Sequence, residues 1–596
     1  MENKEVHLKV FKSLKDYFYR YRFQYAWGIF FLIVVDLAQM LIPQFTRRAI
    51  NLISLGSFEL NEIIVLGLYA LGTMALVSAG RFLWRYFLHG ASRHIETELR
   101  DKFFGHLLTL SYDFYQKNKI GDLMARAIND LGAVRQALGM GLVTICDSLV
   151  MTIAILLIIF VQDASTAIWA VLPLPIVTLL ILLFGKLVGK RFFRVQETYS
   201  EMSDVAQETF AGIRVVKSFV KEAWFVKKFA DTNEDYKAAN MVLAKIFSFF
   251  FPFVTFLSGL TSIILLLVGG KKVLDGQMLA GDLVALFTYL QMLIWPLMGA
   301  GFMVNMIQRG AVSLTRINEV LETKPSIISR KEEVGSRKVV VSNDDAVRVE
   351  HLSFTYPGNE KKVLDDVSFS VQRGTMLGIL GKTGSGKSTL IKTLTRMVDP
   401  PVGTVFVNGI DVHEYSLAAL RGCFGVTPQD SYLFSDSIRD NIAYGIDQSL
   451  KNTPQYNEKV QEAARISAID QDLTAFHEGW DTVIGEKGLT LSGGQKQRIA
   501  MSRALLIKPE ILILDDSLSA VDAETERHIL DALFTELKGR TAIVISHRVS
   551  TLRHAAQVLV LENGRIAEYG SPDELIKQNG FYAKTAALQQ LEGKNG

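Results

Sequence analysis

Residues 376–388 read MLGIL-GKTGSGKS, a run in which an apolar strand, a glycine turn and a helix start follow one another directly. The uninterrupted apolar stretch Met376–Leu380 is typical of a buried strand, and a helical pattern opens at Thr389. Between them, the spacing GxxxxGKS indicates a phosphate-binding loop, because its backbone amides and the following helix N-terminus attract an anion. The residues predicted to bind nucleotide here are Gly381, Lys382, Thr383, Gly384, Ser385, Gly386, Lys387, Ser388 and Thr389.

Two further motifs follow at the positions that a nucleoside triphosphate site requires. The apolar strand Ile511–Leu514 ends in Asp515, a carboxylate expected to bind Mg²⁺ together with the Ser388 hydroxyl. Between the two strands lies Leu491–Gln495, LSGGQ, whose small residues before a predicted helix let backbone amides approach a phosphate. Each motif alone has a plainer explanation, a turn or a strand end. Their order along one chain favours a site for a nucleoside triphosphate and Mg²⁺.

The first half of the chain is much more apolar than the second. Hydrophobic residues make up 49% of the 596 residues and charged residues 21%, and the mean hydropathy is +0.22. A membrane-spanning helix needs about 20 apolar residues, whereas buried helices of soluble proteins typically have apolar runs of about 10–14 residues. A soluble bundle is therefore disfavoured. Six segments qualify as spans: residues 24–50, 62–88, 138–162, 164–186, 246–270 and 279–304.

The connections between these spans alternate in length and charge. Residues 89–137 and 187–245 are long and rich in charged side chains, while the other connections are short. Positive charge gathers on the cytosolic side of membrane proteins, so both termini are expected in the cytosol, with the pair Lys271–Lys272 as a local exception. The periodicity of Glu96–Leu110 and Glu201–Phe229 predicts helices that continue out of the membrane.

The chain divides into four predicted segments. Residues 1–22 are basic, aromatic and amphipathic, which predicts a helix on the cytosolic membrane surface. Residues 23–322 form an all-α membrane domain of six helices, and residues 323–346 have the composition of a linker. From residue 347 to 596, short β-branched strands alternate with helical stretches, which predicts an α/β domain around the phosphate-binding loop.

Charge and cysteine content argue against two other classes of function. The net charge is +3 and no basic stripe is interleaved with aromatic residues, so no nucleic-acid partner is expected. The two cysteines, Cys146 and Cys423, fall in different predicted domains. They are predicted to be packing residues rather than a disulfide or a metal site.

Polar residues interrupt the apolar spans at Asp36, Gln39, Asp147, Gln291 and Asn305. Buried charge is costly in lipid, so these residues are expected to face the bundle interior or a cavity, where a carboxylate would suit an amphipathic cation. A purely structural role is the alternative. Aromatic and methionine side chains around Phe249–Phe251 could line an adaptable pocket, or simply pack or face lipid.

Together these motifs resemble the ATPase domain of ABC transporters, and nearly the whole chain resembles an exporter-type half-transporter. The resemblance implies that Tyr356 stacks on adenine and that Gln429 contacts Mg²⁺ and senses the membrane domain. It implies that Asp522 couples two nucleotide sites and that His547 contacts the γ-phosphate. It also implies a dimer, because the signature element of one chain closes over ATP held by another; these residues are Ser492, Gly493, Gly494 and Gln495.

Two more segments resemble parts of ABC exporters that join the two domains. Ser111–Asp130 resembles the first cytosolic loop, which docks on the ATPase domain. Thr482–Gly488 resembles the exporter segment that touches the membrane domain.

The chain departs from the family at Asp516, where a glutamate usually follows the Mg²⁺ carboxylate. A general base must reach the attacking water, and Asp is shorter than Glu by one C–C bond, ~1.5 Å, so hydrolysis at this site should be slow. An aspartate with an intact signature resembles one subunit of heterodimeric bacterial multidrug exporters. A homodimer with two weakened sites is the alternative. A second alternative is a shift of the loop that lets Asp516 act as the general base.

The predicted function is ATP-driven export of hydrophobic or amphipathic compounds across the plasma membrane by alternating access. The predicted catalytic residues are Asp516, His547 and Gln429, and the predicted metal ligands are Ser388, Gln429 and Asp515. The expected partners are a second half-transporter, membrane lipids and a small amphipathic substrate. A lipid flippase, or an ATP-gated regulator with slow hydrolysis, are the alternatives.

Overall fold

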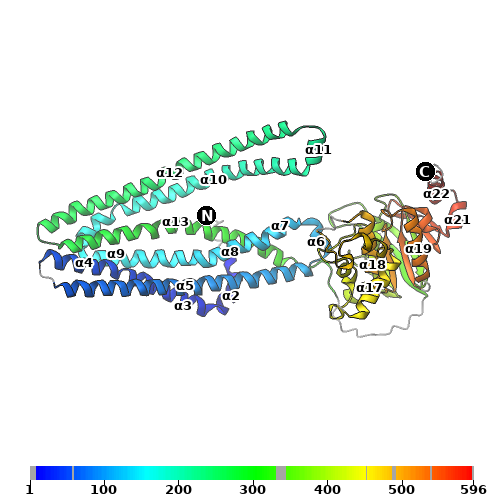
Figure 1. Cartoon of the computed structure of the whole chain (residues 1–596), viewed down its shortest axis with the longest axis horizontal. Coiled ribbons are helices and arrows are strands. Elements are labelled where there is room, and N and C mark those ends of the chain that lie inside the picture. The colour runs from blue at the N-terminus through cyan, green and yellow to red at the C-terminus, as the bar shows by residue number, and fades with distance from the viewer. Residues whose placement is uncertain are drawn as a thin grey trace. The chain divides into compact units, whose positions relative to one another are not determined.

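The computed structural model describes residues 9–56, 59–329, 344–451, 453–485, 491–536 and 540–592. The chain forms two compact units, Met1–Thr109 with Asn118–Lys324, and Leu110–Lys117 with Pro325–Gly596. Figure 1 labels the elements along the chain.

Long helices build the first unit (Figure 1). By length and hydropathy, and within the described residues, four helical stretches are able to cross a membrane: Arg22–Ser54, Leu60–Thr109, Ile120–Trp169 and Glu222–Leu274. Two other long helices run through the fourth and sixth predicted spans, and the count of six stays a prediction. The long helices are α3 (Arg22–Gln39), α4 (Leu41–Ser54), α5 (Leu60–Thr109), α9 (Leu142–Val171), α10 (Leu174–Ala211), α12 (Glu222–Leu274) and α13 (Ala280–Glu322).

Several of these helices extend beyond the apolar segments. The 50-residue α5 continues to Thr109, and α10 and α12 form an antiparallel pair joined through α11 (Ile213–Ser218) (Figure 1). The prediction that residues 96–110 and 201–229 extend the membrane helices is therefore confirmed. Short helices follow α5: α6 (Tyr112–Lys117), α7 (Ile120–Ala125), η2 (Arg126–Asp130), α8 (Leu131–Gln136) and η3 (Ala137–Gly141).

The N-terminal segment differs from the single predicted helix. It consists of the 3₁₀ turn η1 (Val10–Leu14) and α2 (Lys15–Arg20), and residues 1–8 lie outside the described residues. The Asn318 amide of α13 donates a 3.1 Å hydrogen bond to the Ser13 hydroxyl. This part of the segment packs on a helix of its own unit.

The short connection predicted at residue 163 is confirmed. The backbone leaves the helical region at Asp163 (φ −158°, ψ 95°), where α9 consists of two helices that meet at a kink, whereas Leu172 and Pro173, between α9 and α10, keep helical dihedral angles. The Asp163 carboxylate accepts hydrogen bonds from Ser165 and Thr166 and pairs with Lys272 at 2.6 Å. Because these contacts cap the next helical turn, the chain continues as a helix past the break.

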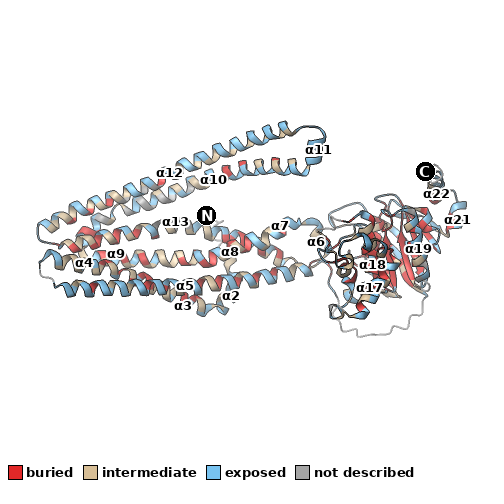
Figure 2. Cartoon of the chain, viewed as in Figure 1, coloured by how far each residue is buried: buried red, intermediate tan, exposed pale blue. Residues whose placement is uncertain are grey.

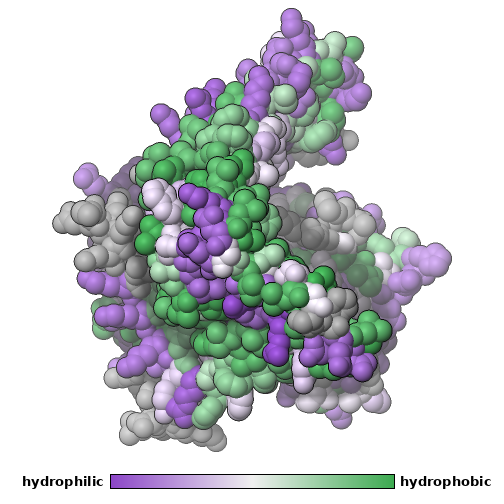
Figure 3. Space-filling model, turned by 90° about the vertical axis from the view of Figure 1, so that its left-hand side faces the viewer, coloured by the Kyte–Doolittle hydropathy of each residue, from purple (hydrophilic) through white to green (hydrophobic). Residues whose placement is uncertain are grey.

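Ion pairs join helices at the end of the bundle where α4 meets α5 and α12 meets α13. Arg47 of α4 pairs with Asp282 of α13 at 2.5 Å, in addition to the Lys272–Asp163 pair. Figure 3 views the molecule toward this end and shows hydrophilic side chains gathered amid hydrophobic surface. Ionic contacts therefore connect elements that are far apart in sequence.

Two sheets form the centre of the second unit. The first has the order β10-β9-β3-β8-β7-β6, with all neighbours parallel except β10, and the second has the antiparallel order β2-β1-β4-β5. The strands are β1 (Asp345–Phe354), β2 (Leu364–Gln372), β3 (Met376–Leu380), β4 (Val405–Val407), β5 (Ile410–Asp411), β6 (Phe424–Thr427), β7 (Ile511–Asp515), β8 (Thr541–Ile545), β9 (Gln557–Glu562) and β10 (Arg565–Gly570).

Helices flank these sheets, and every residue of the central strands β3, β7 and β8 is buried (Figure 2). Because parallel strands end at the same edge of a sheet, the residues after β3, β7 and β8 come together there. The helices are α14 (Lys387–Leu394), α15 (Leu417–Gly422), α16 (Ile438–Ile442), η4 (Ala443–Gly445), η5 (Gln448–Leu450), α17 (Pro454–Ile466), η6 (Asp470–Ala475), η7 (Gly479–Asp481), α18 (Gly493–Leu506), α19 (Ala523–Glu536), α20 (Val549–Leu552), α21 (Pro572–Lys577) and α22 (Phe581–Glu592).

Candidate nucleotide site

The glycine-rich loop between β3 and α14 needs glycine for steric reasons. Gly384 and Gly386 have φ values of +80° and +108°, a region that residues with a Cβ rarely adopt. A Cβ at Gly386 would lie 2.9 Å from the carbonyl oxygen of Val363, and one at Gly381 would collide with the Leu561 carbonyl. The loop is thus packed against neighbouring backbone, and α14 begins at Lys387.

Lys387 is held inside this loop. Its amine donates hydrogen bonds to the carbonyl oxygens of Gly381 (2.7 Å) and Lys382 (2.9 Å), and the residue is 8% exposed. Burial lowers the pKa of Lys387, although the nearby carboxylates of Asp515 and Asp516 oppose the shift. A cation surrounded by backbone carbonyls at a helix N-terminus is well placed to exchange these partners for phosphate oxygens.

The loops that follow β3, β6, β7 and β8 enclose a cavity of about 190 Å³. It brings together residues that are up to 184 positions apart in the sequence, from Val363 to His547. Ten of the residues predicted to act at the site are among its lining. The lining residues are Val363, Thr383, Gly384, Gly386, Lys387, Ser388, Thr389, Gln429, Asp515, Asp516, Ile545 and His547.

The donor atoms in this cavity fit Mg²⁺. The Ser388 hydroxyl, the Asp515 carboxylate and the Gln429 amide supply oxygen ligands, which this hard cation prefers. Burial raises the pKa of Asp515, and a hydrogen bond from Ser388 opposes that shift. Among the described residues no group of three or more His, Cys, Asp or Glu side chains is placed to hold a metal. Binding of Mg²⁺ here would therefore depend on nucleotide phosphates as further ligands.

Tyr356 lies next to the phosphate-binding helix without lining the cavity. Its hydroxyl is 3.3 Å from the Thr389 hydroxyl, and its ring packs edge-on against Phe354, with centroids 5.1 Å apart. Of the other loop residues, Ser385 is buried, while the Lys382 side chain is 67% exposed and lies 3.5 Å from the Glu562 carboxylate.

The signature element lies outside this cavity. Ser492 caps α18, because its hydroxyl accepts from the Gln495 backbone N–H (3.2 Å) while Gln495 Oε1 accepts from the Ser492 N–H (3.0 Å). A Cβ at Gly494 would lie 2.8 Å from the Ala520 carbonyl oxygen, so α18 packs closely on the loop after β7. Asp522, at the end of that loop, accepts a 2.9 Å hydrogen bond from the Thr525 N–H, which lowers the pKa of Asp522.

Two glutamines that no sequence motif singled out join helices to the loops of the site, one to the loop after β7 and one to the loop that carries His547. Gln497 Nε2 donates to the Ser519 hydroxyl (3.1 Å), and its Oε1 accepts from the Ala520 N–H (3.1 Å). Gln589 of α22 donates to the His547 carbonyl (2.7 Å) and accepts from the Val549 N–H (2.8 Å). Gln497 follows the signature by two residues, a proximity that could have drawn attention to it, whereas nothing in the sequence points to Gln589.

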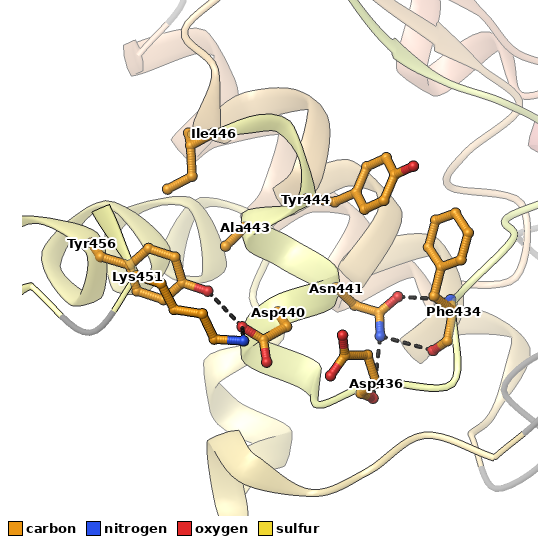
Figure 4. A pocket seen from close by; sticks show the side chains of 9 residues that line it. All are labelled: Phe434, Asp436, Asp440, Asn441, Ala443, Tyr444, Ile446, Lys451 and Tyr456. Carbon is orange, nitrogen blue, oxygen red and sulfur yellow. Dashed lines mark hydrogen bonds and ion pairs between the residues drawn. The ribbon is translucent and has the colours of Figure 1, made fainter. Parts of the chain in front are cut away.

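A second cavity, of about 200 Å³, lies around α16 (Figure 4). Asp440 accepts hydrogen bonds from the Tyr456 hydroxyl (2.8 Å) and the Ser437 hydroxyl (2.9 Å) and pairs with Lys451 at 2.9 Å (Figure 4 draws Tyr456 and Lys451). Burial alone would raise the pKa of Asp440, but these contacts lower it. The Asn441 amide donates to the Phe434 carbonyl (3.0 Å) (Figure 4). This network holds in place the segment that follows Gln429.

The structure describes all of the candidate coupling segment 111–130 and part of the segment 482–488. The α6 part of residues 111–130 belongs to the second unit, where the Tyr112 ring lies 5.1 Å from the Lys392 amine and Asp113 accepts from the Ser326 hydroxyl (2.8 Å). Of the segment 482–488, the Thr482 carbonyl accepts from the Ile438 N–H (3.1 Å), while residues 486–488 lie outside the described residues.

Of the five polar residues in the apolar spans, Asp36, Gln39 and Asp147 are buried or partly buried, whereas Gln291 and Asn305 are exposed. Asp36 is 1% exposed, and Asp147 is half-buried close to it. The Gln39 amide oxygen accepts from Arg81 at 2.9 Å.

Comparisons with known proteins agree with this architecture. The family described as ABC transporter transmembrane region matches residues 25–297, and the family described as ABC transporter matches residues 364–519. A probable multidrug resistance ABC transporter ATP-binding/permease protein, YheI of Bacillus subtilis, is 37% identical over 98% of both chains. The multidrug resistance-like ATP-binding protein MdlA of Escherichia coli is 33% identical over 98% of this chain and 97% of its own.

A lipid exporter and a solved structure are also similar. An ATP-dependent lipid A-core flippase of Pseudomonas fluorescens is 35% identical over 85% of this chain and 83% of its own. The structure of a bacterial Atm1-family ABC exporter with ATP bound superimposes with a TM-score of 0.78 at 25% identity, covering 95% of this chain and 99% of that one. With membrane helices and a phosphate-binding α/β unit in one polypeptide, and relatives matched along nearly its full length, this chain belongs to the ABC transporters as an exporter-type half-transporter.

Proposed function

We propose that this chain exports hydrophobic or amphipathic compounds across the plasma membrane as one half of a heterodimeric ABC transporter. Two relatives along 98% of the chain carry multidrug resistance names. In this proposal residues 23–322 form a six-helix membrane domain, residues 323–346 a linker and residues 347–596 the nucleotide-binding domain, with both termini in the cytosol. The observation that carries the heterodimer is the cavity itself, which is lined by Lys387, Ser388, Gln429 and Asp515 but has Asp516 where glutamate is usual.

Each residue of the cavity has a proposed role. Lys387 and the loop amides bind the phosphates, and Ser388, Gln429 and Asp515 hold Mg²⁺, which neutralises phosphate charge when bound. His547 contacts the γ-phosphate. The short side chain of Asp516 reaches the attacking water poorly, so hydrolysis at this site is slow.

The residues outside the cavity contact either the adenine ring or the nucleotide of a second chain. Tyr356 stacks on adenine beside Thr389. Ser492–Gln495 and Asp522 face the nucleotide of the partner subunit, since they do not reach the cavity of their own chain. ATP binding then draws the two halves together and turns the membrane cavity outward, and hydrolysis at the partner's site resets it.

Two other functions have specific support. A lipid flippase is favoured by the 35% identity to the lipid A-core flippase. An ATP-gated regulator is favoured by Asp516, since slow hydrolysis suits a gate. Substrate movement against a gradient, with substrate-stimulated ATPase activity, supports the exporter. ATP-dependent passive conductance supports the gate, and lipid movement without drug transport supports the flippase.

The heterodimer is tested by co-expression with a second half-transporter encoded next to this chain. ATPase activity is measured for Asp516→Glu here and for Glu→Gln at the matching position of the neighbour. Loss of activity with the neighbour's change, and retained activity with Asp516→Glu, supports the proposal. An active ATPase formed by this chain alone, silenced by Asp516→Ala, would show that Asp516 is itself a working base and that the heterodimer is wrong.

A further inference from the structure

A hollow lies between α10 and α12, outside the nucleotide site and away from the buried carboxylates. It has a volume of about 420 Å³, and every lining residue except Lys245 is apolar. The two helices run side by side (Figure 1), and their surface is largely exposed (Figure 2). The hollow therefore combines a hydrocarbon-like wall with one cation.

The floor of this hollow is rigid and aromatic. The rings of Phe184 and Phe250 stack with centroids 3.5 Å apart and planes 13° apart. Phe250 is buried, and Leu257 and Ile294 of α13 pack in the same cluster. In contrast, Phe249 at the rim is 69% exposed. A packed floor with an open rim is a preformed site rather than a gap between loose side chains.

The position of Lys245 sets the depth of the hollow in the membrane. Lys245 directly precedes the apolar segment 246–270 of α12, and Leu187 directly follows the apolar segment 164–186 of α10. One turn beyond Leu187 on the same helix face, Lys190 adds a second exposed cation. Because these ends of the two apolar segments lead into the long charged connection, the rim lies at the headgroups of the inner leaflet.

Charge complementarity then selects the occupant. A concavity open to the bilayer core fills with acyl chains, because water there lacks hydrogen-bond partners. Basic residues between membrane helices on the cytosolic side attract anionic headgroups. We propose that this hollow binds an anionic phospholipid of the inner leaflet, with an acyl chain on the Phe184–Phe250 floor and its phosphate at Lys245. The inference concerns a bound lipid and does not depend on which compound is exported.

The proposal is tested with the full transporter, including its partner half, in nanodiscs. Photoactivatable phosphatidylglycerol and phosphatidylcholine, with the reactive group on the acyl chain, are compared at equal fractions, and labelled peptides are mapped by mass spectrometry. Peptides containing Leu183 and Phe249 should be labelled about fivefold more by phosphatidylglycerol, the preference expected for one lysine at the membrane surface.

Two variants and a control make the test specific. Lys245→Gln should reduce the preference for phosphatidylglycerol, whereas Lys271→Gln, beyond the opposite end of the apolar segment 246–270, should leave it unchanged. Leu183→Trp, which fills the hollow, should reduce labelling by both lipids. Equal labelling by the two lipids in the unmodified protein would overturn the proposal. So would a photo-crosslinker at position 249 that reacts with the partner subunit instead of lipid, because the hollow would then be a subunit interface.

Discussion

Lys387 is the residue on which nucleotide affinity depends most directly, because its buried amine already contacts two loop carbonyls. Replacing it with alanine removes charge-assisted hydrogen bonds to phosphate, each typically about 1.5–3 kcal/mol, so Lys387→Ala should lower ATP affinity roughly 10- to 100-fold. Binding of a fluorescent ATP analogue measures this. Lys382→Ala is the control, since the Lys382 side chain is 67% exposed. The ATP affinity of this variant should stay within about twofold of that of the unmodified protein. Equal losses in both variants would contradict the assigned role.

At the residue scale, the sequence predicted most residues of the cavity but not the residues that hold its loops in place. Glycine spacing predicted the loop because Gly384 and Gly386 need left-handed backbone, and that requirement is local. The apolar strand Ile511–Leu514 led to Asp515, whereas His547 was predicted only from the family resemblance. The hydrogen bonds of Gln589 to the His547 backbone depend on how α22 packs, and no local pattern encodes that contact.

At the scale of elements, α22 fixes the loop that carries His547. Gln589→Ala removes two hydrogen bonds to that backbone, each worth about 0.5–1.5 kcal/mol. We expect faster amide exchange in residues 546–549, with ATP affinity unchanged. Gln590→Ala, at the exposed neighbouring position, is the control and should alter neither quantity. Unchanged exchange in the Gln589 variant would show that α22 does not position the loop.

A second element-level prediction concerns the break between α3 and α4. The buried Tyr289 hydroxyl donates to the Met40 carbonyl (2.6 Å) at this break and accepts from the Gln44 amide (2.9 Å). Tyr289→Phe should destabilise the membrane domain by about 1–2 kcal/mol, because both partners lose a hydrogen bond within the bundle. Thermal unfolding of the purified protein should show a lower melting temperature. The exposed Tyr69→Phe should match the unmodified protein, and equal melting of all three proteins would exclude the role.

Helix boundaries show where sequence patterns reach their limit. Periodicity predicted that the charged stretches 96–110 and 201–229 are helical, because charged faces at a 3.6-residue repeat are a local signal. The break expected at Asp163 is present, because α9 consists of two helices that meet at a kink there. The ion pair at this kink involves Lys272, a residue 109 positions away, and no local pattern shows that contact.

At the scale of the whole molecule, the residues that the structure describes include a phosphate-binding cavity and a signature element that does not line it. Ser492→Ala should therefore lower ATP hydrolysis of the assembled transporter at least tenfold, while ATP binding to this chain's own cavity persists. The hydroxyl would be missing at the partner's nucleotide, where a charge-assisted contact is worth about 1.5–3 kcal/mol.

Ser571→Ala provides a matched control for that loss. Ser571 caps α21 with the same reciprocal arrangement that Ser492 forms on α18, so both changes remove a helix cap worth about 1 kcal/mol. The two variants should therefore melt at similar temperatures and differ only in hydrolysis. Hydrolysis measured on the purified assembly, beside its melting curve, separates the two effects. If both variants lose activity equally, the loss reflects helix capping, and the signature of this chain does not complete a site on a second subunit.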